Sequence, residues 1–222
     1  MNIDRVVMPC GPQPEYRQYI PLVTRAWSNL GFETHIVETT SMDYRECLVA
    51  LLLALQHEKG TALISDVDMM PLTEAYFRNV AALARDDELV IYSSDGYEQW
   101  STGLYPACYM LAHGRVWAEL LNPYGLSDTE LRAFWKAAPG TGNPCDLRFS
   151  YEVLLQWLIW DKWKNRRLAL RRRGFEGGAA YARIDRAAWE WQDGGYYIDA
   201  HLPRAMEPWH RIPELLATTE RR

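Results

Sequence analysis

The sequence predicts an α/β domain with a mostly parallel central sheet flanked by helices. Short apolar segments typical of buried strands alternate, along residues 4–95, with longer segments whose apolar residues recur at helical spacing. This alternation indicates parallel strands joined by helical crossovers. At 222 residues, with 48% hydrophobic and 24% charged residues, the chain is long enough for one domain with a sizeable core.

The expected elements follow one another regularly through the first part of the chain. The expected strands are residues 4–9, 32–39, 61–66 and 88–95, and the expected helices are residues 15–31, 44–56 and 72–86. Gly31 and Gly60 stop the first two helices, and Ser41 with Asp43 caps the second. Pro71 is expected to begin the third helix.

The second half of the chain is less regular. A strand at residues 105–112 and a helix from about Arg115 are expected, followed by loops around residues 139–146 and a tryptophan-rich helix over residues 151–165. The sequence contains no internal repeat, low-complexity segment or linker, so we expect a single domain over residues 1–222.

Composition argues against several classes of protein. The formal net charge of -5 disfavours nonspecific nucleic-acid binding, and four scattered cysteines without a C-x-x-C pair argue against a zinc knuckle or a disulfide scaffold. The longest apolar run, residues 48–55, is too short to cross a bilayer, and the N-terminus lacks the basic and apolar regions of a signal peptide. We therefore expect a cytoplasmic protein. The 10 tryptophans and 13 tyrosines are compatible with a carbohydrate or nucleotide ligand.

Two carboxylates, Asp66 and Asp68, follow the third expected strand in the sequence ALISDVDMMPL. Side chains at i and i+2 lie on the same side of an extended chain, so the pair converges if the strand continues or turns gently. In an open parallel sheet, ligands bind beyond the carboxyl ends of the strands, where this pair falls. Oxygen ligands there suit Mg2+ or Mn2+ and leave positions free for phosphate oxygens. The pair is thus a candidate clamp for a metal-bound diphosphate, and the alternative is that each aspartate serves a turn or a helix cap.

Several segments together resemble the small GT-A glycosyltransferases, in which an Asp-x-Asp motif binds a metal and a nucleotide sugar. The resembling segments are YRQYIPLVTRAWSNLGFETHIVET, MDYRECLVALLLAL, ALISDVDMMPL and GYYIDAHLPR, which span most of the chain in order. The resemblance implies one GT-A-like (Rossmann-like) domain, with nucleotide-sugar binding mainly in residues 1–112 and the acceptor side mainly in residues 113–222. It also implies a UDP-sugar donor, an acceptor hydroxyl on a glycan or glycolipid, and Mn2+ or Mg2+ as the cofactor.

The resemblance assigns roles to the acidic motif and to a C-terminal histidine. Asp68 would ligate the metal directly, and Asp66 would bind the ribose or reach the metal through water. Asp199 and His201 face one way if their segment is extended, so the His201 imidazole would complete the metal shell. A lone histidine is otherwise an ordinary surface or core residue.

The other candidates for donor binding lie at strand and helix ends. They are Pro9, Cys10, Gly11, Arg45 and Arg204. The first three end the first strand and are expected to line the nucleotide pocket. Arg45 would meet the diphosphate or the base, and Arg204 would pair with phosphate, although ordinary surface charge is the alternative for both.

Three acidic residues are candidates for the base that deprotonates the acceptor hydroxyl. Glu152 is preferred over Asp146, and Asp95 is the third. Glu152 and Asp146 flank the start of the tryptophan-rich helix, where either is equally suited to a structural interaction with the helix dipole. The sequence leaves open whether the reaction inverts or retains the anomeric configuration.

Two surface features concern the acceptor. Tyr97, Trp100 and Thr102 lie in a loop whose composition suits stacking on a sugar ring and hydrogen bonding to its hydroxyls. The alternative is that this is an ordinary polar loop. The segment at residues 162–173 is basic and contains a tryptophan, which suits peripheral contact with an anionic membrane. The alternative is that it is the solvated end of a helix.

Two other function classes are compatible with the sequence. A nucleotidyltransferase would also bind nucleotide phosphates through Asp-x-Asp and metal, but only a weak phosphate loop follows the first strand. A carbohydrate-binding module would use its aromatic residues without turnover.

Overall fold

The fold is described from a computed structural model of the chain. It describes residues 1–41, 44–95, 105–106, 108–137, 168–173, 182–191, 196–203 and 211–220, with the backbone alone at residues 44, 45, 48 and 220. The strands are β1 (Arg5–Cys10), β2 (Thr34–Glu38), β3 (Thr61–Ile64), β4 (Met69–Pro71), β5 (Leu89–Ile91), β6 (Met110–His113), β7 (Leu168–Leu170), β8 (Ala182–Ile184) and β9 (Tyr197–His201). The helices are α1 (Pro14–Arg17), α2 (Ile20–Asn29), α3 (Tyr44–Gln56), α4 (Glu74–Ala82), α5 (Gly114–Leu121), α6 (Asp128–Ala137) and α8 (Ile212–Glu220).

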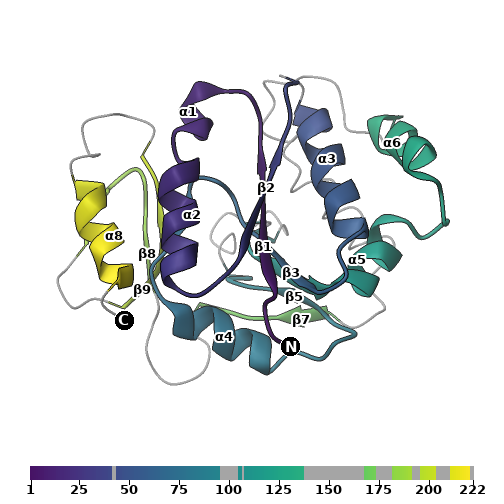
Figure 1. Cartoon of the computed structure of the whole chain (residues 1–222). Helices are drawn as coiled ribbons and strands as arrows, with labels where there is room; N and C mark the ends of the chain where they lie inside the picture. Colours follow the sequence, from purple (N-terminus) through teal and green to yellow (C-terminus); the bar gives the residue numbers. More distant parts are fainter. Residues whose placement is uncertain are drawn as a thin grey trace.

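Six strands form the central sheet in the order β2-β1-β3-β6-β5-β7 (Figure 1). β1 pairs in parallel with β2 and β3, β5 pairs in parallel with β7, and β6 runs antiparallel to both β3 and β5. All strands of this sheet except β6 therefore point the same way. The prediction of a mostly parallel sheet flanked by helices is confirmed.

Alternate residues of the central strands face the two sides of the sheet. Val6, Met8 and Leu63 belong to the hydrophobic cluster that includes α2 and α4, whereas Val7 and Ile64 belong to the cluster that includes α3, α5 and α6. Figure 1 shows α2 and α3 on opposite sides of the sheet. Because both faces are covered, the central strands are mostly apolar rather than alternately polar.

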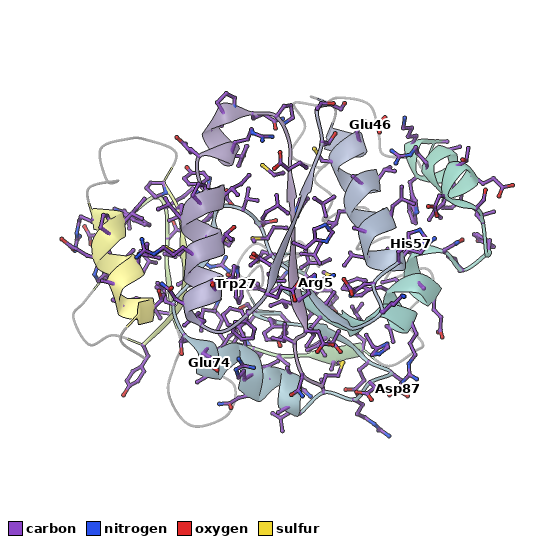
Figure 2. All side chains as sticks on the ribbon, viewed as in Figure 1. Arg5, Trp27, Glu46, His57, Glu74 and Asp87 are labelled. Carbon is purple, nitrogen blue, oxygen red and sulfur yellow. The ribbon has the colours of Figure 1, made fainter. Side chains whose placement is uncertain are left out.

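The single helix predicted over residues 15–31 is instead divided into α1 and α2. Pro21 is the second residue of α2, and it has no N–H to donate to the Arg17 carbonyl, so the first helix ends and a second begins. Trp27 lies on the buried side of α2 (Figure 2). Its ring packs edge-on against the ring of Phe77 from α4, with 4.8 Å between the ring centroids. This contact links α2 and α4 on the same face of the sheet.

A second, three-stranded sheet has the order β4-β9-β8 and was not predicted. Pro71 lies in its edge strand β4, where a missing N–H is tolerated, and does not begin a helix; the next helix, α4, begins at Glu74. β4 pairs antiparallel with β9, so that Met69 lies opposite His201. This pairing brings a residue near the C-terminus beside the residue that follows Asp68.

Two predicted strands differ from those observed. The strand expected at residues 88–95 ends at Ile91, because Ser93 is buried in a turn with φ of 50° and its N–H donates to the Tyr76 hydroxyl. The strand expected at residues 105–112 is β6, which begins only at Met110. The expected tryptophan-rich helix lies outside the described residues. Within the described part of the chain, no helix has the length and apolar character needed to cross a membrane.

Candidate functional site

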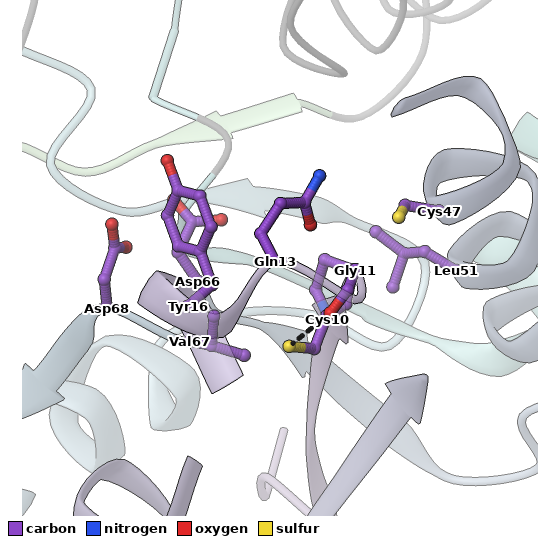
Figure 3. Close-up of a pocket in the computed structure, with 10 residues that line it drawn as sticks. Cys10, Gly11, Gln13, Tyr16, Cys47, Leu51, Asp66, Val67 and Asp68 are labelled. Carbon is purple, nitrogen blue, oxygen red and sulfur yellow. Dashed lines mark hydrogen bonds between the residues drawn. The ribbon is translucent and has the colours of Figure 1, made fainter. Parts of the chain in front are cut away.

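The carboxyl ends of β1 and β3 lie side by side, because the strands are parallel neighbours with Val7 opposite Ile64. A cavity of about 130 Å³ lies beyond these ends (Figure 3). Its lining residues are Pro9, Cys10, Gly11, Gln13, Tyr16, Cys47, Leu51, Asp66, Val67 and Asp68. The structure therefore gathers the end of the first strand and the acidic pair around one cavity.

Gly11 allows side chains to approach closely across this cavity. A Cβ atom at position 11 would lie 2.1 Å from Gln13 Oε1 and 3.2 Å from Cys47 Sγ, so a larger residue would displace Gln13 and narrow the cavity. The neighbouring Cys10 thiol donates to the Gly11 carbonyl at 3.3 Å. Burial raises the pKa of the Cys10 thiol, which makes it a packed neutral group rather than a reactive thiolate.

Asp66 and Asp68 lie in the turn after β3 rather than in the strand itself. The Ser65 N–H donates to the Val7 carbonyl at 3.0 Å, and the Met69 N–H donates to the Asp66 carbonyl at 3.1 Å, which closes the turn. Figure 3 shows the two carboxylates projecting to the same side. Asp68 is largely buried, at 7% exposed. The two side chains thus project together from a turn, the second of the two arrangements that the spacing allowed.

His201 reaches the acidic pair through the second sheet. The Leu202 N–H donates to the Asp68 carbonyl at 2.8 Å, and His201 Nε2 lies 3.7 Å from Asp68 Oδ2. Burial lowers the pKa of His201 to about 4, and nearby Arg186 and Arg183 favour the neutral form further, against the attraction of Asp68. At neutral pH the imidazole is therefore uncharged, the form that can bind a metal.

The donor atoms of Asp68 and His201 fit a divalent cation. A carboxylate oxygen and a neutral imidazole nitrogen are both ligands for Mn2+. Two ligands at about 2.1 Å from one cation lie no more than about 4.2 Å apart, and the distance of 3.7 Å between Asp68 Oδ2 and His201 Nε2 is within that limit. In the part of the chain that the structure describes, however, no three His, Cys, Asp or Glu side chains form a ready metal cluster.

Two arginines that sequence reasoning missed lie next to this pair of residues. Arg183, in β8, donates from Nε and Nη2 to the two carboxylate oxygens of Asp199, at 2.8 Å each. Arg186, in the turn after β8, donates from Nη2 to Asp68 Oδ2 at 2.6 Å. The only signal in the sequence was the presence of two strand-like segments of opposite charge, ARIDR with two arginines and YYIDAH with an aspartate.

Both carboxylate oxygens of Asp199 are engaged by Arg183. Asp199 is fully buried in β9, opposite Arg183 in the register of β8 and β9. Asp199 therefore links β9 to β8. It lies two residues before His201, but its carboxylate is bound to Arg183. Beside the pair, burial raises the pKa of Cys108 to about 12, despite the opposing effect of Arg183.

The remaining described candidate, Asp95, is engaged elsewhere. Its Oδ1 accepts the Arg173 N–H at 3.1 Å, and its Oδ2 lies 3.8 Å from Arg172 Nε. These contacts join the turn after β5 to the residues after β7. Asp95 is not among the described residues that line the cavity.

Arg45 lies in the first turn of α3, and only its backbone is described. The other predicted residues lie outside the described part of the chain, so their roles stay predictions. They are Tyr97, Trp100, Thr102, Asp146, Glu152 and Arg204.

Comparison with known proteins identifies the fold. No family model matches the sequence, and no curated protein matches it. A glycosyltransferase involved in glycosylation of the major capsid of PBCV-1 superimposes with a TM-score of 0.55 at 10% identity, over 96% of this chain and 98% of that one. Glycosyltransferase GlyE of Streptococcus pneumoniae TIGR4, in its apo form, superimposes with a TM-score of 0.56 at 10% identity over 99% of this chain.

The present chain spans 60% of the length of GlyE, and nearly the whole of the PBCV-1 enzyme. At this level of identity the likeness establishes the fold. The chain therefore has the mixed α/β fold of GT-A-type glycosyltransferases, as its sequence predicted.

Proposed function

We propose that this protein is a metal-dependent glycosyltransferase that moves a sugar from a nucleotide-sugar donor to an acceptor hydroxyl of a glycan or glycolipid. The observation that carries the proposal is the position of Asp66 and Asp68. They follow β3 at the carboxyl edge of the sheet, line a cavity with the end of β1, and have His201 Nε2 3.7 Å from Asp68 Oδ2. The shared fold with two glycosyltransferases supports the same reaction class.

The donor half of the domain is proposed to be residues 1–112. Pro9, Cys10 and Gly11 would contact the nucleotide, because they end the strand beside the acidic pair and line the same cavity. Asp66 would bind the ribose or reach the metal through water. A UDP-sugar is the donor we propose, with Arg45 and Arg204 as further contacts for its phosphates or base.

Asp68 and His201 would hold Mn2+ or Mg2+ against the donor. When bound, the cation would neutralise the charge that develops on the departing diphosphate. The carboxylate of Asp68 and the neutral imidazole of His201 supply the donor atoms. The Leu202 N–H donates to the Asp68 carbonyl at 2.8 Å, and this backbone bond would keep the two proposed ligands near each other.

The acceptor half is proposed to be residues 113–222, with the loop around residue 100. In the transfer, the acceptor oxygen forms a bond to the anomeric carbon, the bond from that carbon to the diphosphate oxygen breaks, and the acceptor proton passes to a base. Glu152 is our first candidate for that base, followed by Asp146 and Asp95. Tyr97, Trp100 and Thr102 are proposed to contact the acceptor sugar.

Product analysis tests this function directly. The protein is incubated with Mn2+ and each of the UDP, GDP, CDP and dTDP sugars, and the released nucleotide is identified. We expect slow release of a nucleoside diphosphate from one donor, dependent on Mn2+ and lost in Asp68→Asn. Release of pyrophosphate would instead indicate a nucleotidyltransferase, and ligand binding without any product would indicate a binding module.

A further inference from the structure

The guanidinium of Arg186 lies at the proposed cation site. Its Nη2 donates to Asp68 Oδ2, the same oxygen that lies 3.7 Å from His201 Nε2. The Arg186 and Asp68 side chains are only 20% and 9% exposed, so the pair is largely shielded from water. A cation ligated by Asp68 and His201 would therefore meet a positive charge already bound to one of its ligands.

Arg186 also has unused hydrogen-bonding capacity. Its Nε is buried and has no hydrogen-bond partner among the described residues. A buried donor without an acceptor is costly, and an arginine fork is suited to two parallel bonds to a carboxylate or phosphate. By contrast, Arg183 uses both its Nε and its Nη2 on Asp199. Of these two arginines, Arg186 is thus the one with a buried donor that has no partner among the described residues.

The charges of the site determine how cation and nucleotide binding affect each other. Asp68 and Arg186 together carry no net charge, and the neighbouring Asp66 adds one negative charge to the site. A divalent cation arriving alone must displace the guanidinium from Asp68, and the loss of this ion pair opposes binding. A cation arriving with a diphosphate brings phosphate oxygens that can accept from the displaced fork.

We propose that Arg186 is a built-in counterion of Asp68 that competes with the divalent cation and transfers to the diphosphate when cation and nucleotide bind together. This inference rests on the proposed function and adds its ligand-binding order to it. Arg186 makes cation binding weak by itself and strengthens it in the presence of a nucleoside diphosphate. The coupling between the two ligands is therefore a property of this side chain.

Mn2+ binding, measured from the free-ion signal in electron paramagnetic resonance, tests the inference without any turnover. Titrations are made with Mn2+ alone and with Mn2+ plus each of UDP, GDP, CDP and dTDP. The variants are Arg186→Gln, Arg186→Lys and Asp68→Asn, and Arg115→Gln, an exposed arginine of α5, is the matched control. Circular dichroism and thermal unfolding establish that each variant is folded.

Arg186→Gln is expected to bind Mn2+ alone about tenfold more tightly than the wild type, because one charge-assisted hydrogen bond no longer opposes the cation. The same variant is expected to lose most of the gain in Mn2+ affinity that the nucleotide produces. Arg186→Lys restores the charge and should return both quantities toward wild type, which a merely structural role of Arg186 would not do. Arg115→Gln should match the wild type throughout.

The inference is overturned if Arg186→Gln binds Mn2+ alone no more tightly than the wild type, or if its nucleotide coupling is unchanged. If that result accompanies loss of Mn2+ binding in Asp68→Asn, the metal site stands and only the role of Arg186 fails. If the wild type and Asp68→Asn bind Mn2+ and nucleotides equally, or neither binds them, the proposed function fails with it.

Discussion

Breaking the buried ion pair between Arg183 of β8 and Asp199 of β9 is expected to lower stability strongly, because the remaining charge is left buried without a partner. Asp199→Asn removes the charge while keeping the shape of the side chain. Asp199 is 0% exposed and the Arg183 side chain is 15% exposed, so the remaining guanidinium would be left with little water to solvate it. Breaking a buried pair in this way costs about 3–5 kcal/mol, a large part of the roughly 5–15 kcal/mol by which a typical domain is stable.

Urea unfolding followed by tryptophan fluorescence measures this loss, with the exposed pair of Arg5 and Glu33 as the matched control. That pair has a similar separation, 3.0 Å, but its side chains are 35% and 66% exposed, so Glu33→Gln should change the free energy of unfolding by less than about 1 kcal/mol. Replacing both buried partners, as Arg183→Met with Asp199→Leu, should cost less than the single change because no charge is left unpaired. A loss in Asp199→Asn no larger than that in Glu33→Gln would refute the reasoning.

Three further predictions concern packing and pH. A Cβ at Gly114 would lie 1.7 Å from the Glu58 carbonyl oxygen, so Gly114→Ala should lower the free energy of unfolding by about 2 kcal/mol or more. Gly125 has a φ of +64° and open space where a Cβ would lie, so Gly125→Ala should lower the free energy of unfolding by only about 1 kcal/mol. If urea denaturation gave equal losses of stability for Gly114→Ala and Gly125→Ala, this reasoning would be wrong. Because burial raises the pKa of Cys108 from 9.0 to about 12, the folded protein keeps a proton that the unfolded chain loses above pH 9.0. Stability should therefore fall as the pH rises from about 9 toward about 12, and less steeply in Cys108→Ala; equal slopes would argue against this cause. Gly11→Ala should narrow the cavity and weaken nucleotide binding, measured by calorimetry. It should change the free energy of unfolding by less than about 1 kcal/mol, because the flexible end of the Gln13 side chain can move. An unchanged nucleotide affinity would exclude Gly11 from the binding site.

Most strands of the central sheet could be predicted because the sequence pattern of each one is local. β7 was missed, because it lies within the basic segment at residues 162–173, which had suggested a membrane contact or a solvated helix end, whereas Leu168–Leu170 form a strand beside β5. The apolar run at residues 61–64 and the helical spacing of residues 44–56 each specify an element without reference to the rest of the chain. The division of the first helix was also available locally, from Pro21, but the apolar spacing on both sides suggested one continuous helix. Pro71 was misassigned for a related reason, because a proline suits the start of a helix and the edge of a sheet equally well.

The second sheet and its arginines could not be predicted, because they depend on pairing between distant segments. Arg186 and Asp68 are 118 residues apart in the chain, and no periodicity links them. His201 was found only because its segment resembled a known family; its position beside Asp68 follows from the pairing of β4 with β9. The acidic pair itself was predictable from its place after a buried strand.

The central claim, that Asp68 and its neighbours bind a cation and a nucleotide together, is tested most directly by thermal unfolding with UDP, GDP, CDP and dTDP sugars, with and without Mn2+. Binding to the native state raises the unfolding temperature by mass action. We predict a rise for one nucleotide that requires Mn2+, is lost in Asp68→Asn and is reduced in His201→Ala. No rise with any donor, or a rise that is the same without Mn2+ and in Asp68→Asn, would contradict the claim.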